Sequence, residues 1–242
     1  MDFPTTHWSL LAQATLNGSI PSRRALEALC GSYWVPVYRF IRSRRVPDPD
    51  AQDLTQEFML HLIQKSLFSR ADPLRGKFRS FLLGALVRFL ADVADKRQAL
   101  KRGGDRRHVS LDTAEPEVGW HSVCTPDEAR SFDRNWALRI LESALQRLHS
   151  EYSEQHRDDA FLTLERFLPG AGPLVTYEEA ARELGISLAA LKSEVHRLRR
   201  RLRALVREEV AQTVSAPHEI EPEMAYLQQV LADASVSYDN GQ

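Results

Sequence analysis

The sequence predicts an all-α fold made of two small helical domains joined by a flexible linker. Apolar residues recur at intervals of three and four over much of the chain, which is the period of an amphipathic helix. Alternating β-branched segments hardly occur, so strands are not expected. We divide the 242 residues into four parts: a first domain at 1–104, a linker at 105–132, a second domain at 133–207, and a C-terminal extension at 208–242.

Three helices are expected in the first domain. Apolar residues close to helical spacing predict the first helix over residues 21–45, and prolines at 47 and 49 break it. A second helix begins near Asp50 and continues to about Ser66. A third runs from about Gly76 into Lys101, where two glycines end the pattern.

About four helices are expected after the linker. Residues 105–132 contain scattered polar residues, Pro and Gly without apolar periodicity, which is typical of a linker. Helical spacing resumes at Trp136, and a Pro- and Gly-rich stretch at 169–173 forms a turn before the last helices. No internal repeat is visible.

Charge is strongly segregated, although the formal net charge is only -1. Between Arg75 and Arg107, ten basic residues face only three acidic ones. A second basic run, at 192–207, contains a single acid, and the chain beyond Arg207 has no Lys or Arg at all. The two basic blocks indicate a polyanionic partner. The acidic tail could compete with that partner for the basic blocks.

Several other classes of protein are disfavoured. The two cysteines are far apart, so we expect a reducing compartment and no structural zinc. The N-terminus lacks the pattern of a signal peptide, and no apolar run approaches the length of a membrane span. There is no Gly-rich phosphate loop, no histidine pair at metal spacing and no nucleophile–base pattern. We therefore expect a cytoplasmic protein that is not an enzyme and has no metal or cofactor.

Residues 176–203 carry the features of a helix-turn-helix in the right order. Thr176 and Glu179 match a capping box, and Gly185 can adopt the left-handed conformation that ends a helix. Ser187 can then cap a second helix, whose basic residues lie largely off its apolar stripe. Such a helix can enter the major groove and contact phosphates. The alternative is an antiparallel helical hairpin, or a short coiled coil, with solvated arginines.

A second motif, DAQDLTQE at residues 50–57, places acidic residues on one face of the second helix. An acidic face suits a basic protein surface and would repel DNA. Taken alone, it could equally be the ordinary solvated face of an amphipathic helix.

Together the motifs resemble those of bacterial RNA polymerase sigma factors, in particular the extracytoplasmic-function (ECF) group of the sigma-70 family. DAQDLTQE is similar to that family's polymerase-binding helix, whose pattern is close to D-A-E-D-L-x-Q-E. Segment 67–97 resembles the helix and loop that engage the minus-ten promoter element. The helix-turn-helix resembles the reader of the minus-thirty-five element. The three motifs occur in the family's order over roughly residues 20–205.

The resemblance implies a factor that binds core RNA polymerase and then recognises and melts promoter DNA. The docking face on the polymerase's clamp helices would comprise Asp50, Asp53 and Glu57. A loop at 67–77 would receive a base flipped from the non-template strand. Contacts with the minus-ten element fall on Arg75, Lys77, Phe78, Arg79, Arg88, Lys96 and Arg97. Those with the minus-thirty-five element fall on Lys192, Ser193, His196, Arg197 and Arg200.

The sequence departs from the family pattern in places. Gln52 replaces the usual second acid, Glu194 stands where relatives commonly carry Arg, and Thr55 occupies a usually aliphatic position. Some similar sigma factors are thought to be controlled by a serine/threonine kinase instead of an anti-sigma factor, so Thr55 is a candidate phosphorylation site. Alternatively, Thr55 faces the apolar side, replaces a valine and bonds back to a carbonyl.

Two further alternatives remain at this stage. A conventional helix-turn-helix repressor or activator would act as a symmetric dimer and would give the acidic face no role. The acidic tail either folds over a basic DNA-binding surface and lowers its affinity, or forms a frayed or loosely packed terminal helix.

Overall fold

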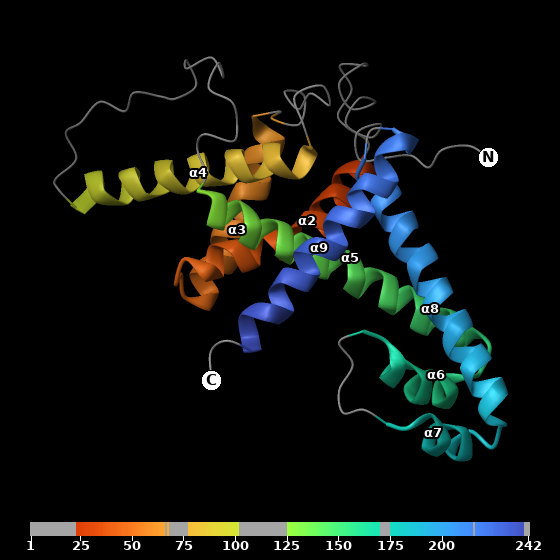
Figure 1. The fold of residues 1–242 in the computed structure, drawn as a ribbon. Coiled ribbons are helices and arrows are strands. Elements are labelled where there is room, and N and C mark those ends of the chain that lie inside the picture. Colours follow the sequence, from red (N-terminus) through yellow and green to blue (C-terminus); the bar gives the residue numbers. More distant parts are fainter. Residues whose placement is uncertain are drawn as a thin grey trace. The chain divides into compact units, whose positions relative to one another are not determined.

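The computed structural model describes residues 23–65, 67, 77–101, 125–169, 175–214 and 216–239 (Figure 1). Every regular element among these residues is helical, so the predicted all-α class is confirmed. The helices form two compact units. Unit 1 comprises the described residues up to Arg139 together with those from Thr213 onward, and unit 2 comprises residues 140–212. The interior of the predicted linker, residues 102–124, lies outside the described residues.

Unit 1 begins with three helices close to the predicted ones: α2 (Arg23–Ser43), α3 (Asp48–Gln64) and α4 (Phe78–Lys101). Pro47 and Pro49 flank the start of α3, where a proline costs no intrahelical hydrogen bond. Pro36 lies inside α2, which continues past it. Periodicity therefore predicted these helices well, because it reflects the face that each one buries.

Aromatic side chains join the helices of unit 1 in one core. The ring of Phe78 at the start of α4 packs edge-on against Tyr33 of α2, with 5.2 Å between centroids. Phe58 of α3 meets Phe89 of α4 at 5.4 Å. The largest buried side chains of α2 and α3 in this core include Phe40, Ile41, Phe58 and Leu62, all at most 1% exposed.

Helix α5 (Pro126–Glu154) begins inside the segment predicted as linker. Thr125 and Glu128 cap its first turn reciprocally: the Glu128 N–H donates to the Thr125 hydroxyl at 3.2 Å, and the Thr125 N–H donates to the Glu128 carboxylate at 2.9 Å. Pro126 occupies the first helical position, which suits its fixed φ. Residues 126–132 are thus helical, and a Thr-Pro-Asp-Glu capping signal in the sequence could have indicated it. Phe132 from this turn packs against Phe40.

Unit 2 contains the second half of α5, then α6 (Asp158–Leu164), the 3-10 turn η5 (Glu165–Phe167), α7 (Tyr177–Glu183) and α8 (Leu188–Ala211). Helix α6 contacts both α7 and α8. The apolar stripe of α8 is buried, and Ala180 and Ala181 of α7 are buried with it. Small side chains let two helices approach closely.

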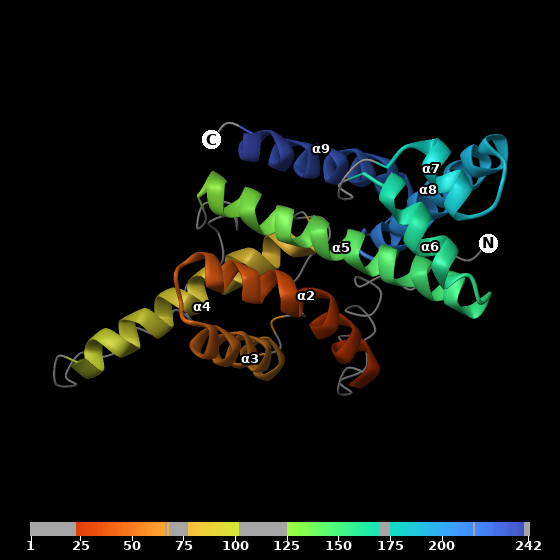
Figure 2. The same ribbon diagram turned by 90° about the horizontal axis from the view of Figure 1, so that it is seen from below.

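The C-terminal extension forms a helix that belongs to unit 1. After the 3-10 turn η6 (Pro217–Glu219), α9 (Ile220–Asp239) buries Ile220, Met224 and Leu227, each 4% exposed. Figure 2 shows α9 and α5, which meet where the Tyr226 hydroxyl donates a hydrogen bond to Asp133. The tail thus forms a terminal helix whose apolar side is packed.

Candidate functional site

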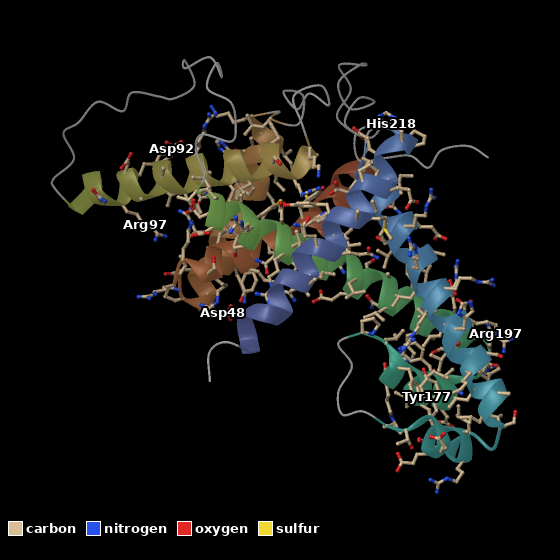
Figure 3. The ribbon with its side chains drawn as sticks, viewed as in Figure 1. Asp48, Asp92, Arg97, Tyr177, Arg197 and His218 are labelled. Atoms are coloured by element: carbon tan, nitrogen blue, oxygen red, sulfur yellow. The ribbon has the colours of Figure 1, made fainter. Side chains whose placement is uncertain are left out.

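Helix α3 presents its acids to solvent. Asp50, Asp53 and Glu57 are all exposed, whereas Ala51 and Phe58 on the opposite side are completely buried. Asp48, labelled in Figure 3, accepts a hydrogen bond from Tyr38, and this bond holds the pKa of its carboxyl below the usual range. The structure therefore turns the three predicted docking residues outward from one helix.

Thr55 lies on the buried side of α3. Its side chain is 0% exposed, and its hydroxyl donates a 2.7 Å hydrogen bond to the carbonyl oxygen of Ala51, one turn earlier. In this state the hydroxyl is closed to an enzyme from solution.

The basic residues at the far end of α4 are accessible. Lys96 and Arg97 are exposed and Arg88 is half-buried. Figure 3 shows Arg97 pointing away from the helix. Arg75, which the sequence grouped with them, lies outside the described residues. Basic side chains on one helix offer several points of attachment for a phosphate backbone.

The start of α4 differs from the expected open DNA-contacting surface. Phe78 is 1% exposed and packs in the core, so its ring is not available to stack on a base in this structure. Arg79 is 5% exposed. Its guanidinium donates to Asp133 at 2.8 Å and also to Glu223, and lies over the ring of Trp136 at 4.4 Å.

Lys77 and Glu223 complete this cluster. The Lys77 ammonium is 2.6 Å from a carboxylate oxygen of Glu223, whose side chain is 4% exposed, while that of Lys77 is 49% exposed. The same ammonium lies 4.4 Å from the ring centroid of Tyr226. Glu223 and Tyr226 come from α9, about 145 residues further along the chain. Sequence analysis did not single out Asp133, Glu223 or Tyr226, because no local pattern marks them.

The electrostatics of the cluster favour a charged Arg79. Burial opposes the charged form, but the carboxylates of Asp133 and Glu223 outweigh it and raise the pKa of the guanidinium. Burial and the hydrogen bond to Asp133 raise the pKa of Tyr226 to about 12. Arg79 thus stays ionised, and Tyr226 remains a hydrogen-bond donor, at physiological pH.

The turn between α7 and α8 has the geometry that the sequence predicted. The Thr176 hydroxyl accepts from the Glu179 N–H at 3.2 Å, and the Glu179 carboxylate accepts from the Thr176 N–H at 3.1 Å. The Thr176 N–H and the Thr176 hydroxyl, which donates to the same carboxylate at 2.8 Å, lower the pKa of Glu179. Gly185 has a φ of +64°, and the Ser187 hydroxyl caps α8 by accepting from the Ala190 N–H. The pair is a helix-turn-helix.

The predicted contact residues of α8 face solvent. Lys192, Ser193, His196, Arg197 and Arg200 are all exposed. Arg197, which is labelled in Figure 3, pairs with Glu194 one turn earlier at 2.6 Å. Within the part of the chain that the structure describes, no carboxylate pairs with Lys192 or Arg200.

Other arginines of α8 hold unit 2 together instead. Arg199 donates to the carbonyl oxygen of Phe167 at 2.6 and 3.1 Å. Arg201 makes a two-pronged ion pair with Glu151 of α5, which lowers the pKa of that carboxyl. The basic run therefore contains two kinds of residue. Arg199 and Arg201 bind other parts of unit 2, whereas Lys192 and Arg200 pair with no carboxylate among the described residues.

Two negative findings concern the described residues only. No helix among them is long and apolar enough to cross a membrane. No group of three or more His, Cys, Asp or Glu among them is arranged to hold a metal ion.

The chain matches the model of a known protein family. A family model described as ECF sigma factor matches residues 38–208, more than half of the chain. The matched range includes all of α3, α4 and α7, and α8 as far as Glu208. No curated protein and no solved structure matches the chain.

Proposed function

The chain belongs to the ECF sigma factor family, the sigma factors being transcription initiation factors, and from this premise we propose how it works. It binds core RNA polymerase through the exposed acids of α3. It recognises and melts promoters through the basic residues of α4 and the helix-turn-helix. The observation that carries the proposal is the single family match that spans these three elements in order.

The docking role of α3 is supported by its two-sided character. One side packs into unit 1, so the helix is rigidly held, while Asp50, Asp53 and Glu57 remain exposed. Like charges on one helix face favour a basic protein surface and disfavour DNA. Such exposed charges set the rate and register of association more than its affinity.

The DNA-binding roles are supported by exposed cations on both units. In unit 1, Lys96 and Arg97 extend along α4 and are positioned to follow a phosphate backbone. In unit 2, Lys192 and Arg200 lie on the exposed side of the second helix of the helix-turn-helix, which is the helix that enters the major groove in this motif. Backbone attachment is thus assigned to exposed cations of α4, and major-groove binding to the second helix of the helix-turn-helix.

The test is transcription of genomic DNA by purified bacterial core polymerase with and without the full-length protein. Discrete start sites that appear only with the protein, and that share upstream sequence elements, are expected. Tight binding of duplex DNA by a dimer of the protein alone, with no binding to core enzyme and no new starts, would overturn the proposal in favour of a conventional repressor or activator.

A matched pair of charge reversals tests the docking face. Glu57→Lys is expected to slow association with core polymerase by about tenfold at low salt, because the reversed charge repels the basic surface that the acids attract. Glu154→Lys makes the same change of charge at an exposed position of α5 in unit 2, and should leave core binding unchanged. Equal effects of the two variants would remove the support for a specific acidic face.

A further inference from the structure

Four charged side chains meet at the start of α4. Lys77 and Arg79 carry two positive charges, and Asp133 of α5 and Glu223 of α9 carry two negative ones, so the cluster is neutral. Helix α9 supplies only Glu223 to this balance. Removal of α9 would leave two cations against one carboxylate, a net positive site that one monovalent anionic group would neutralise.

The carboxylate of Glu223 is held as a bridging anion. One of its oxygens lies 2.6 Å from the Lys77 ammonium, and the other accepts from the Arg79 guanidinium. A phosphodiester presents two non-bridging oxygens and one negative charge in a similar way, and both groups accept charge-assisted hydrogen bonds from Lys and Arg. The site is therefore chemically suited to one backbone phosphate.

Contacts other than those with α9 keep Arg79 in place. Its Nε donates to Asp133 at 2.8 Å, and its guanidinium lies 4.4 Å from the ring of Trp136, both on α5. The NH1 atom is directed at Glu223 instead. If Glu223 leaves, the guanidinium stays oriented and its NH1 edge becomes available.

Helix α9 packs through one side only. Ile220, Met224 and Leu227 are buried on the side that carries Glu223, whereas Glu221, Gln228 and Gln229 are exposed. Contact through a single face allows a helix to detach as a unit.

We propose that Lys77 and Arg79 form a binding site for a DNA backbone phosphate, and that Glu223 occupies this site in the free protein. Helix α9 is then an internal competitor of single-stranded minus-ten DNA and is displaced when DNA binds. The inference rests on the proposed promoter-binding role of α4. To that role the inference adds a specific phosphate site, Lys77 and Arg79, and the group that blocks it, Glu223.

The first test compares Glu223→Gln with wild type and with Glu221→Gln, in the full chain and without polymerase. The probe is a labelled mixed-sequence single-stranded DNA oligonucleotide. Gln keeps the shape of the side chain but removes the competing charge, so the affinity for DNA should rise by about tenfold, which corresponds to 1.4 kcal/mol. Glu221 is exposed on the same helix, and its variant should bind as wild type does.

The salt dependence provides a second readout. Each single-strand phosphate contact contributes about 0.7 to the slope of log affinity against log salt. One additional phosphate contact should therefore steepen the slope for Glu223→Gln by up to about 0.7. An unchanged or weaker affinity and an unchanged slope, with the helical content of wild type retained, would overturn the proposal, as would undetectable binding by both proteins.

A measurement on the unmodified chain covers the case in which Glu223→Gln does not fold. Saturating single-stranded DNA should increase hydrogen exchange of the amides in residues 220–232, because α9 must leave its site. Unchanged or slower exchange there on DNA binding would show that α9 does not compete. Success of polymerase-dependent transcription together with either negative result would refute the internal competitor and leave the proposed function intact.

Discussion

At the scale of single residues, Arg79 connects three helices through its charge. It is nearly inaccessible to solvent, and its carboxylate partners Asp133 and Glu223 lie 54 and 144 residues away in the sequence. Burying a charge is costly unless partners satisfy it, and removal of one partner leaves the others uncompensated. Arg79 is thus a determinant of stability in the free protein as well as part of the proposed phosphate site.

We predict that Arg79→Ala lowers the free energy of unfolding of unit 1 by about 3–5 kcal/mol, because it leaves Asp133 without its cation and Glu223 with Lys77 alone. Chemical denaturation followed by circular dichroism measures this change. Arg97→Ala, at an exposed position of the same helix, should stay within about 0.5 kcal/mol of wild type. A loss at Arg79 no larger than that at Arg97 would contradict the buried network.

Variants of Thr55 test whether its hydroxyl is a site of regulation or only part of the core. We predict that Thr55→Val retains wild-type stability to within about 0.5 kcal/mol, because the hydroxyl bonds only to a carbonyl of its own helix. Thr55→Asp should lose about 3–5 kcal/mol, because it buries an unpaired charge. Thermal or chemical unfolding distinguishes them.

The same variants bear on phosphorylation of Thr55. Full promoter activity of Thr55→Val in cells would eliminate the need for a phosphate there and would leave Thr55 as a core residue. Loss of activity by a Thr55→Val protein of normal stability would instead favour a kinase that captures an open form of α3, since the closed form hides the hydroxyl.

At the scale of elements, the helix-turn-helix is set by local chemistry. The reciprocal bonds of Thr176 and Glu179 start α7, the left-handed Gly185 ends it, and the Ser187 hydroxyl starts α8. All these signals lie within twelve residues. The orientation of the recognition helix against α7 therefore depends on a short stretch of sequence.

Replacing each of two glycines by alanine is expected to change the free energy of unfolding in opposite directions. Gly185→Ala should destabilise unit 2 by about 1–2 kcal/mol, because a Cβ disfavours the left-handed conformation even though nothing lies within 4 Å of it. Gly31→Ala in α2 also meets nothing within 4 Å and should stabilise unit 1 by about 0.5–1 kcal/mol, because alanine favours a helix. Chemical denaturation of both variants checks this; the same sign of change for both would refute the argument.

At the scale of the whole molecule, opposite charges are assigned to different partners. The formal net charge of -1 results from exposed acids on α3, basic residues on α4 and α8, and an acidic tail. Under the proposed function, the acids of α3 bind polymerase and the bases of α4 and α8 bind DNA, so the two interactions are separable. A mutation in one set should therefore leave the other function intact.

The double variant Lys192→Ala/Arg200→Ala tests that separation. We predict weaker binding to duplex promoter DNA and a salt slope lower by up to about 1.8, since each duplex phosphate contact contributes about 0.9. Affinity for core polymerase should not change. Arg130→Ala, at an exposed position of α5 in unit 1, serves as a control and should affect neither measurement. Equal loss of DNA and polymerase binding by the double variant would contradict the division of roles.

The sequence by itself determined most of the helices and the exposed faces of α3 and α8. Apolar periodicity located α2, α3, α4 and α8, and the pattern around Gly185 located the turn, because these signals lie within a few residues of one another. The exposure of Asp53 and Lys192 followed from the same periodicity, since each lies off an apolar stripe. Even the start of α5 at Pro126 had a local capping signal in Thr125 and Glu128.

Only the tertiary structure decided which charged residues are free. Lys77, Arg79 and Lys96 look alike as basic residues of one segment, yet Lys96 is exposed whereas Glu223 engages the other two. That pairing depends on the return of α9 to unit 1, across more than a hundred residues. Local patterns report the face that a helix buries, but the partner of a buried charge is fixed by long-range packing, and its neutralisation is decided only when distant segments meet.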